Sequence, residues 1–135
     1  MRKILLALLL VAPTLVSAET LFRDYATETT VLVDLWETDG TDLKVDATFA
    51  TGDCKVMIDE GAEANCANLP TDEGQSYSLV LTAGELTGKR IKVLLVDSAT
   101  KVWLDRSITI ETAGNASSMH PTAITATTNY RSQTR

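Results

Sequence analysis

The stretch Asp53–Val96, DCKVMIDEGAEANCANLPTDEGQSYSLVLTAGELTGKRIKVLLV, decides the fold of this chain. Within Ser76–Thr82, apolar and polar residues alternate, which is typical of a strand with one buried face. Lys89–Val96 repeats this period of two. The residues predicted to point inward in these two strands are Tyr77, Leu79, Leu81, Ile91, Val93 and Leu95. Between and before them lie turn residues, so the stretch indicates consecutive β-strands.

A hairpin begins the stretch. Cys54–Ile58 is followed by Asp59-Glu60-Gly61, which fits a three-residue loop with Gly61 in the left-handed region. That loop pairs Val56 with Ala64 and Cys54 with Cys66, whereas a four-residue loop would put the cysteines on opposite faces. Directly opposed residues have Cα atoms ~4.5–5.5 Å apart, within disulfide range. A structural disulfide is therefore predicted, with two reduced, buried thiols as the alternative.

Two further strands are predicted on the N-terminal side. Thr30–Trp36 would turn Val31, Val33 and Leu35 inward, and a turn at Asp39-Gly40 would follow. Leu43–Phe49 shows the most regular alternation in the chain. It predicts a strand with these residues inward: Leu43, Val45, Ala47 and Phe49.

On the C-terminal side, Leu69-Pro70 predicts a crossover between sheets, because proline cannot donate to a strand ladder. Ala83–Gly88 predicts a corner, and Asp97–Thr100 a hairpin loop. Lys101–Glu111 predicts the last strand, with a bulge near Asp105 that turns Arg106 toward solvent. The inward residues of this strand would be Val102, Leu104, Ile108 and Ile110.

These elements predict an all-β fold, an Ig-like antiparallel β-sandwich of six to seven strands. An up-and-down barrel is the alternative, which the crossover disfavours. Tyr77 is comparable to the tyrosine corner of such sandwiches, whose hydroxyl bonds to upstream backbone. The predicted organisation is a signal peptide at 1–18, a polar lead-in at 19–28, the sandwich at 29–113, and a Thr/Ser-rich tail or linker at 114–135.

The first 18 residues have the pattern of a secretory signal peptide. Arg2 and Lys3 precede an apolar run over 4–16, and Val16-Ser17-Ala18 offers a cleavage site after Ala18. A transmembrane helix needs ~20 apolar residues, so no stable membrane anchor is expected after cleavage. An uncleaved membrane-surface segment or a wrongly chosen start codon is the alternative. Export would place the protein in the periplasm or outside the cell.

The charge of the chain excludes one class of partner. The 135 residues carry 12 basic and 18 acidic side chains, a net charge of −6. Removal of Arg2 and Lys3 would leave ten basic and 18 acidic residues, a net charge of −8. Such a chain repels a phosphate backbone, so no nucleic-acid binding is expected.

Catalytic, cofactor-binding and metal sites are not predicted. His120, the single histidine, lies in the unpatterned C-terminal segment and is expected to be exposed. Cys54 and Cys66 lack the histidine partners of a zinc site. Two acidic groups could bind calcium but are also ordinary acidic turns: Asp39, Asp42 and Asp46, and Asp53, Asp59 and Glu60. Asn115-Ala116-Ser117 forms a glycosylation sequon by coincidence.

Trp36 and Trp103 are candidate interface residues. Both have the parity opposite to the apolar residues of their predicted strands, so each could be exposed. Exposed tryptophans are strong anchors in protein interfaces. In the alternative, both cover the edge of the sandwich or pack under the lead-in.

The order of several motifs resembles that of a family of tailed-bacteriophage virion proteins. The motifs are a Gly-Ala hairpin turn at Gly61-Ala62, the strand at Tyr77–Thr82, and a closing segment that ends in Gly-Asn-Ala-Ser at 114–117. The closing segment also holds Asp105, Ile108, Ile110 and Thr112 at the family's spacing. The resemblance extends over about residues 21–120, most of the chain after the signal-like segment.

This resemblance implies a non-enzymatic structural protein of the virion, in the tail, the fibre attachment or the capsid decoration. Its partners would be other virion proteins, present in repeated copies. The N-terminal segment departs from the family, whose members assemble in the host cytoplasm. An exported bacterial Ig-like module, a surface or periplasmic binding domain, is therefore the alternative.

Overall fold

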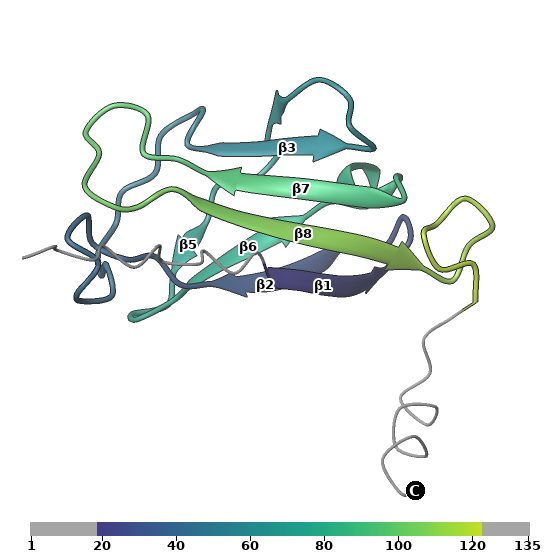
Figure 1. Ribbon diagram of the computed structural model, residues 1–135, viewed down its shortest axis with the longest axis horizontal. Coiled ribbons are helices and arrows are strands. Elements are labelled where there is room, and N and C mark those ends of the chain that lie inside the picture. Colours follow the sequence, from purple (N-terminus) through teal and green to yellow (C-terminus); the bar gives the residue numbers. More distant parts are fainter. Residues whose placement is uncertain (1–18, 123–135) are drawn as a thin grey trace, which may run out of the picture.

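The computed structural model describes residues 19–122 and shows an all-β sandwich of two sheets (Figure 1). The five-stranded sheet has the order β1-β8-β7-β3-β4, and the three-stranded sheet has the order β2-β6-β5. The strands of the first sheet are β1 (Glu19–Asp24), β8 (Arg106–Ala113), β7 (Arg90–Leu95), β3 (Cys54–Ile58) and β4 (Ala64–Asn65). Those of the second are β2 (Thr29–Val33), β6 (Tyr77–Leu81) and β5 (Thr71–Asp72).

The strand order matches the arrangement of an immunoglobulin domain. β2-β6-β5 corresponds to strands B, E and D, and β3-β7-β8 to strands C, F and G. The predicted crossover is confirmed, since Pro70 separates β4 of one sheet from β5 of the other. Eight strands form rather than six to seven, because β1 and the two-residue β5 were not predicted, while the strand predicted at 43–49 does not form.

The core lies between the sheets and consists of the alternating residues of β2, β3, β6, β7 and β8. The inward positions predicted for β2, β6 and β7 are all buried, and Ile108 and Ile110 of β8 join them. Burying one aliphatic side chain of this size contributes ~1.5–3 kcal/mol. Because this energy is gained only when the alternating aliphatic side chains are buried, their alternation determines which faces of the two sheets pack against each other.

The predicted lead-in is a strand. Residues 19–24 form β1, which pairs with β8 in parallel, so the sandwich begins at Glu19 and is not wholly antiparallel. Most side chains of β1 are exposed, and Leu21 alone packs against the core. A strand held mainly by backbone hydrogen bonds has no clear sequence period, which is why alternation did not reveal it.

The prediction of a strand at Leu43–Phe49 is wrong. This segment is irregular, apart from an isolated bridge between Trp36 and Leu43. Asp46 has a φ of 54°, which breaks an extended conformation. The Tyr77 hydroxyl then holds the segment, because it donates to the Lys44 carbonyl (2.7 Å) and accepts from the Ala47 N–H (2.9 Å).

Tyr77 thus binds upstream backbone, as expected from the tyrosine-corner comparison, but from strand β6 rather than from the corner before strand F. The hairpin also differs in detail. The Gly61 N–H donates to Ile58, and it is Asp59 and Glu60, not Gly61, that have positive φ. The register nevertheless pairs Val56 with Ala64, as predicted.

The last predicted strand is too long at its start. β8 begins at Arg106, and residues 101–105 belong to the loop from β7. Val102 and Leu104 point outward, while Trp103 is buried. Parity therefore changes between Trp103 and Ile108, near the predicted bulge, but Arg106 is half-buried and pairs with Glu19 (3.1 Å).

The first part of the predicted tail, residues 114–122, is folded onto the sandwich. The rest of the predicted tail (123–135) and the predicted signal peptide (1–18) lie outside the described residues. The segment returns along the end of β8, since the His120 N–H donates to the Thr112 carbonyl and the Gly114 N–H donates to the His120 carbonyl. No helix within 19–122 is long and apolar enough to cross a membrane.

Candidate functional site

One end of the sandwich carries three exposed apolar side chains on two connections that contact each other. The β2–β3 connection (34–53) and the β7–β8 connection (96–105) meet there, at the left of Figure 1. Trp36, Val102 and Leu104, here called the apolar loop end, are 41%, 44% and 45% exposed. Monomeric proteins rarely gather exposed large apolar residues in one place without an interaction function.

The two connections are joined by backbone contacts. The Leu104 N–H donates to the Trp36 carbonyl (2.9 Å), and Glu37 forms a bridge with Trp103. A tight turn lies beside them, where the Gly40 N–H donates to Glu37 and Gly40 has a φ of 72°. An added Cβ at Gly40 would contact Leu104. The apolar loop end is thus held in position by both connections.

Trp103 supports this surface from below. It is 2% exposed, and its ring lies 5.2 Å from the ring of Phe49, which in turn contacts Tyr77 edge to face at 5.3 Å. The two candidate tryptophans therefore differ. Trp36 is exposed and remains an interface candidate, whereas Trp103 is buried in the core beside Phe49.

Two buried carboxylates shape the same loops. Asp97 accepts hydrogen bonds from the N–H groups of Val102 and Thr100 and from the Thr100 hydroxyl. Asp53 accepts bonds from the Ala50 N–H and from the N–H and hydroxyl of Ser98, so it ties one connection to the other. Both side chains are almost fully buried.

Burial alone would raise the pKa of both carboxyls, but the hydrogen bonds outweigh it and lower each pKa below the ordinary 3.8. Both groups are therefore charged in the folded protein at neutral pH. A lowered folded pKa stabilises the fold above the ordinary value, and this contribution is lost as the pH falls through the folded pKa. These two carboxylates therefore stabilise the loops at neutral pH, and their contribution declines as the pH falls below the ordinary value of 3.8 toward each lowered pKa.

A groove of about 670 Å³ adjoins the apolar loop end. Its lining combines apolar and charged side chains: Asp34, Trp36, Thr38, Lys101, Trp103, Leu104, Asp105 and Arg106. The two cations already have partners, because Lys101 pairs with Asp105 (3.2 Å) and Arg106 with Glu19. The groove is therefore mainly apolar, and Asp34 is the one charged lining residue without an ion pair within residues 19–122.

Cys54 and Cys66 are joined by a disulfide, with their Cα atoms 5.4 Å apart. The Cys66 N–H also donates to the Cys54 carbonyl, so the bridge joins two adjacent strands at the edge of the five-stranded sheet. Cys54 is buried and Cys66 packs against the core. The bond therefore lies within the fold as a structural link, not at a reactive surface.

His120 is not freely exposed. Its Nε2 lies 2.8 Å from Glu111 Oε2, and its ring contacts Phe22 edge to face. The hydrogen bond from His120 holds the pKa of Glu111 below its usual range. Ser118 is near, but its hydroxyl bonds to the backbone carbonyls of Asn115 and His120 rather than to the imidazole. The three side chains thus do not form a nucleophile, base and acid relay.

The two acidic groups considered for calcium do not assemble. No cluster of three or more His, Cys, Asp or Glu side chains that could hold a metal ion occurs in the part of the chain described. Asp59 instead accepts from the N–H groups of Lys89 and Arg90. Asp39 accepts a hydrogen bond from the Thr41 N–H, and Asp53 accepts the hydrogen bonds from the two connections described above.

Sequence reasoning missed the exposure of Val102 and Leu104, because it placed them on the inward face of a strand. The bulge near Arg106 was the available signal, since a parity change there moves the preceding apolar residues outward. Comparison of the chain with family models, curated proteins and solved structures gave no match.

Proposed function

We propose that this protein is a non-enzymatic structural module that acts through protein–protein contacts made by the apolar loop end. The supporting observation is the cluster of Trp36, Val102 and Leu104, held by the buried carboxylates beneath it. Aromatic anchors surrounded by polar residues are the usual energetic centre of an interface. A rigid surface also loses little conformational entropy when it binds.

The proposed setting is a bacteriophage virion, where the partners are other virion proteins in repeated copies. The order of the motifs from Gly61-Ala62 to the Gly-Asn-Ala-Ser segment at 114–117 supports this setting. The net charge of −6 keeps the domain soluble before it assembles.

The second candidate is an exported bacterial module that binds at the cell surface or in the periplasm. The disulfide between Cys54 and Cys66 favours this candidate, because such bonds persist in oxidising compartments. The signal-like pattern of residues 1–18 points the same way. In both settings the apolar loop end is the binding surface, so one experiment tests the contact itself.

A photo-crosslinking amino acid placed at Leu104 should give one discrete crosslinked product in the producing cells. The same amino acid at Leu69, which is similarly exposed in the crossover between β4 and β5, serves as the control. Both sites lie on loops, so the substitution leaves the core intact. Equal products from both positions, or none from Leu104, would contradict a role for the apolar loop end.

A further inference from the structure

The open edge of β2 suggests a second binding mode. β2 is the outer strand of the three-stranded sheet and pairs only with β6 among residues 19–122. In an immunoglobulin domain, strand A lies beside strand B in this sheet. Here the first strand, β1, pairs with β8 of the opposite sheet instead. Within residues 19–122, the edge of β2 that faces away from β6 is therefore unpaired.

The sequence of β2 lacks the usual protection of an edge. Proteins shield edge strands with charges, prolines or bulges, but β2 reads TTVLV. By contrast β1, the long edge strand of the other sheet, contains Glu19, Arg23 and Asp24. Leu32 on the outer face of β2 is 65% exposed, the most exposed large apolar residue in the part of the chain described. About half of the backbone polar groups of β2 point away from β6.

Charge at the two ends of β2 selects the occupant. Glu28 and Asp34 flank the strand, have the same parity as Leu32 and are exposed. Neither carboxylate forms a salt bridge within residues 19–122. A second copy paired antiparallel over all five residues would oppose Glu28 to Asp34 at both ends, and like charges in that position are destabilising. Self-association is therefore disfavoured, and a strand with basic ends is favoured.

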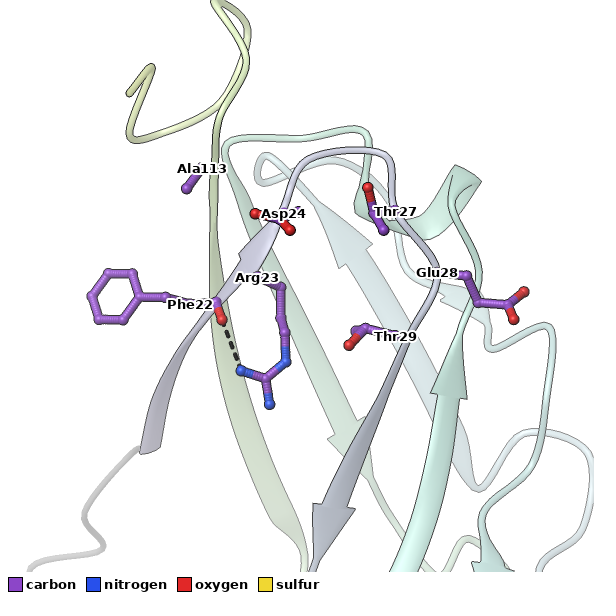
Figure 2. Close-up of a pocket in the computed structure, with 7 residues that line it drawn as sticks. All are labelled: Phe22, Arg23, Asp24, Thr27, Glu28, Thr29 and Ala113. Carbon is purple, nitrogen blue, oxygen red and sulfur yellow. Dashed lines mark hydrogen bonds between the residues drawn. The ribbon is translucent and has the colours of Figure 1, made fainter. Parts of the chain in front are cut away.

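Space is available beside the N-terminal end of the strand. A pocket of about 230 Å³ lies between β1 and β2, lined by residues that include Arg23, Glu28 and Thr29 (Figure 2). Arg23 bonds to the neighbouring Phe22 carbonyl (2.7 Å) rather than to β2. Arg23 therefore does not occupy the backbone groups of β2 with this bond, and side chains of an added strand could enter the pocket.

We propose that the edge of β2 binds an extended segment of a partner protein as an added strand, one with an alternating apolar centre and Lys or Arg at both ends. Backbone hydrogen bonds to Thr29–Val33 would supply affinity, and Glu28 and Asp34 would select the basic ends. Apart from Asp34, which also lines the groove beside the apolar loop end, this contact uses other residues than that surface, and its test does not depend on the crosslinking result at Leu104.

Two capped peptides test the proposal, Lys-Val-Thr-Val-Tyr-Val-Lys and the same peptide with Glu at both ends. Each is titrated to about 1 mM into the isotope-labelled chain, a range that detects weak binding by NMR. The basic peptide should shift the amide signals of residues 29–33 saturably and bind about tenfold more tightly than the acidic one. A double variant, Glu28→Lys with Asp34→Lys, should reverse this preference.

Other outcomes overturn the proposal. These are an absence of saturable shifts, equal affinity for the two peptides, or shifts confined to other strands. Sedimentation that shows a dimer lost in Leu32→Lys but kept in Val45→Lys would identify a second copy as the occupant instead. Tighter binding of a peptide with the sequence of residues 123–135, which contains two Arg and no acidic residue, would also assign the edge to this chain itself.

Discussion

Single side chains hold the loop end in place more than any strand does. Tyr77 is the clearest example, because one hydroxyl satisfies both a carbonyl and an N–H of an irregular segment. A buried backbone group without such a partner costs ~1–3 kcal/mol. The segment Leu43–Phe49 is thus held without strand pairing, by a residue thirty positions downstream of Ala47.

We predict that Tyr77→Phe destabilises the protein by ~1–3 kcal/mol, because the Lys44 carbonyl and the Ala47 N–H lose their partner. Urea unfolding followed by fluorescence measures this change. Tyr25→Phe is the matched control, since only its backbone is hydrogen-bonded within the described residues, and it should change stability by less than ~0.5 kcal/mol. Equal effects of the two variants would refute the role of the Tyr77 hydroxyl.

At the scale of the elements, periodicity predicted the strands that bury one face and failed for those that do not. β2, β3, β6 and β7 lie where alternation placed them, because each contributes a row of side chains to the core. β1 contributes no such row. In residues 101–105 the alternating apolar side chains, Val102 and Leu104, point outward, although alternation alone would place them in the core. The folded segment 114–122 depends on His120 and Ser118 contacts, which have no period at all.

The hairpin of β3 and β4 gives a prediction at this scale. β4 has two residues and little burial, so the disulfide is its main attachment. Cys54→Ala with Cys66→Ala should lower the free energy of unfolding by ~2–3 kcal/mol, as expected for a short loop. Reductant should destabilise the unaltered protein similarly and leave the double variant unchanged.

Thiol titration of the unaltered protein under denaturing, non-reducing conditions is the accompanying measurement. It should detect no free thiol, because the two cysteines of the chain are bonded to each other. Two free thiols would contradict the bond and would weaken the case for an oxidising compartment.

At the scale of the whole molecule, composition indicated a single acidic domain and alternation indicated a sandwich. The apolar loop end could not be predicted, because it depends on where two connections meet in space rather than on either sequence alone. The same holds for the open edge of β2, which exists only because β1 joins the other sheet.

The proposed setting also belongs to this scale. Mass spectrometry of purified virions should detect peptides of this chain at a stoichiometric level, if it is a virion component with repeated copies. Host proteins of the same preparation give the background level. Absence from virions, together with recovery from a periplasmic or extracellular fraction, would favour the exported module.

The parallel pairing of β1 with β8 has a mechanical consequence. The first and last strands of the sandwich run side by side over six residue pairs, so the chain enters at one end of the domain and leaves β8 at the other. A pull on the two ends of the domain would load all the hydrogen bonds between these strands in shear at once, rather than opening them one after another. Glu19 and Arg106 add an ion pair at the start of this contact. A domain with this geometry resists stretching along its long axis, a useful property in a chain that transmits force between two attached bodies.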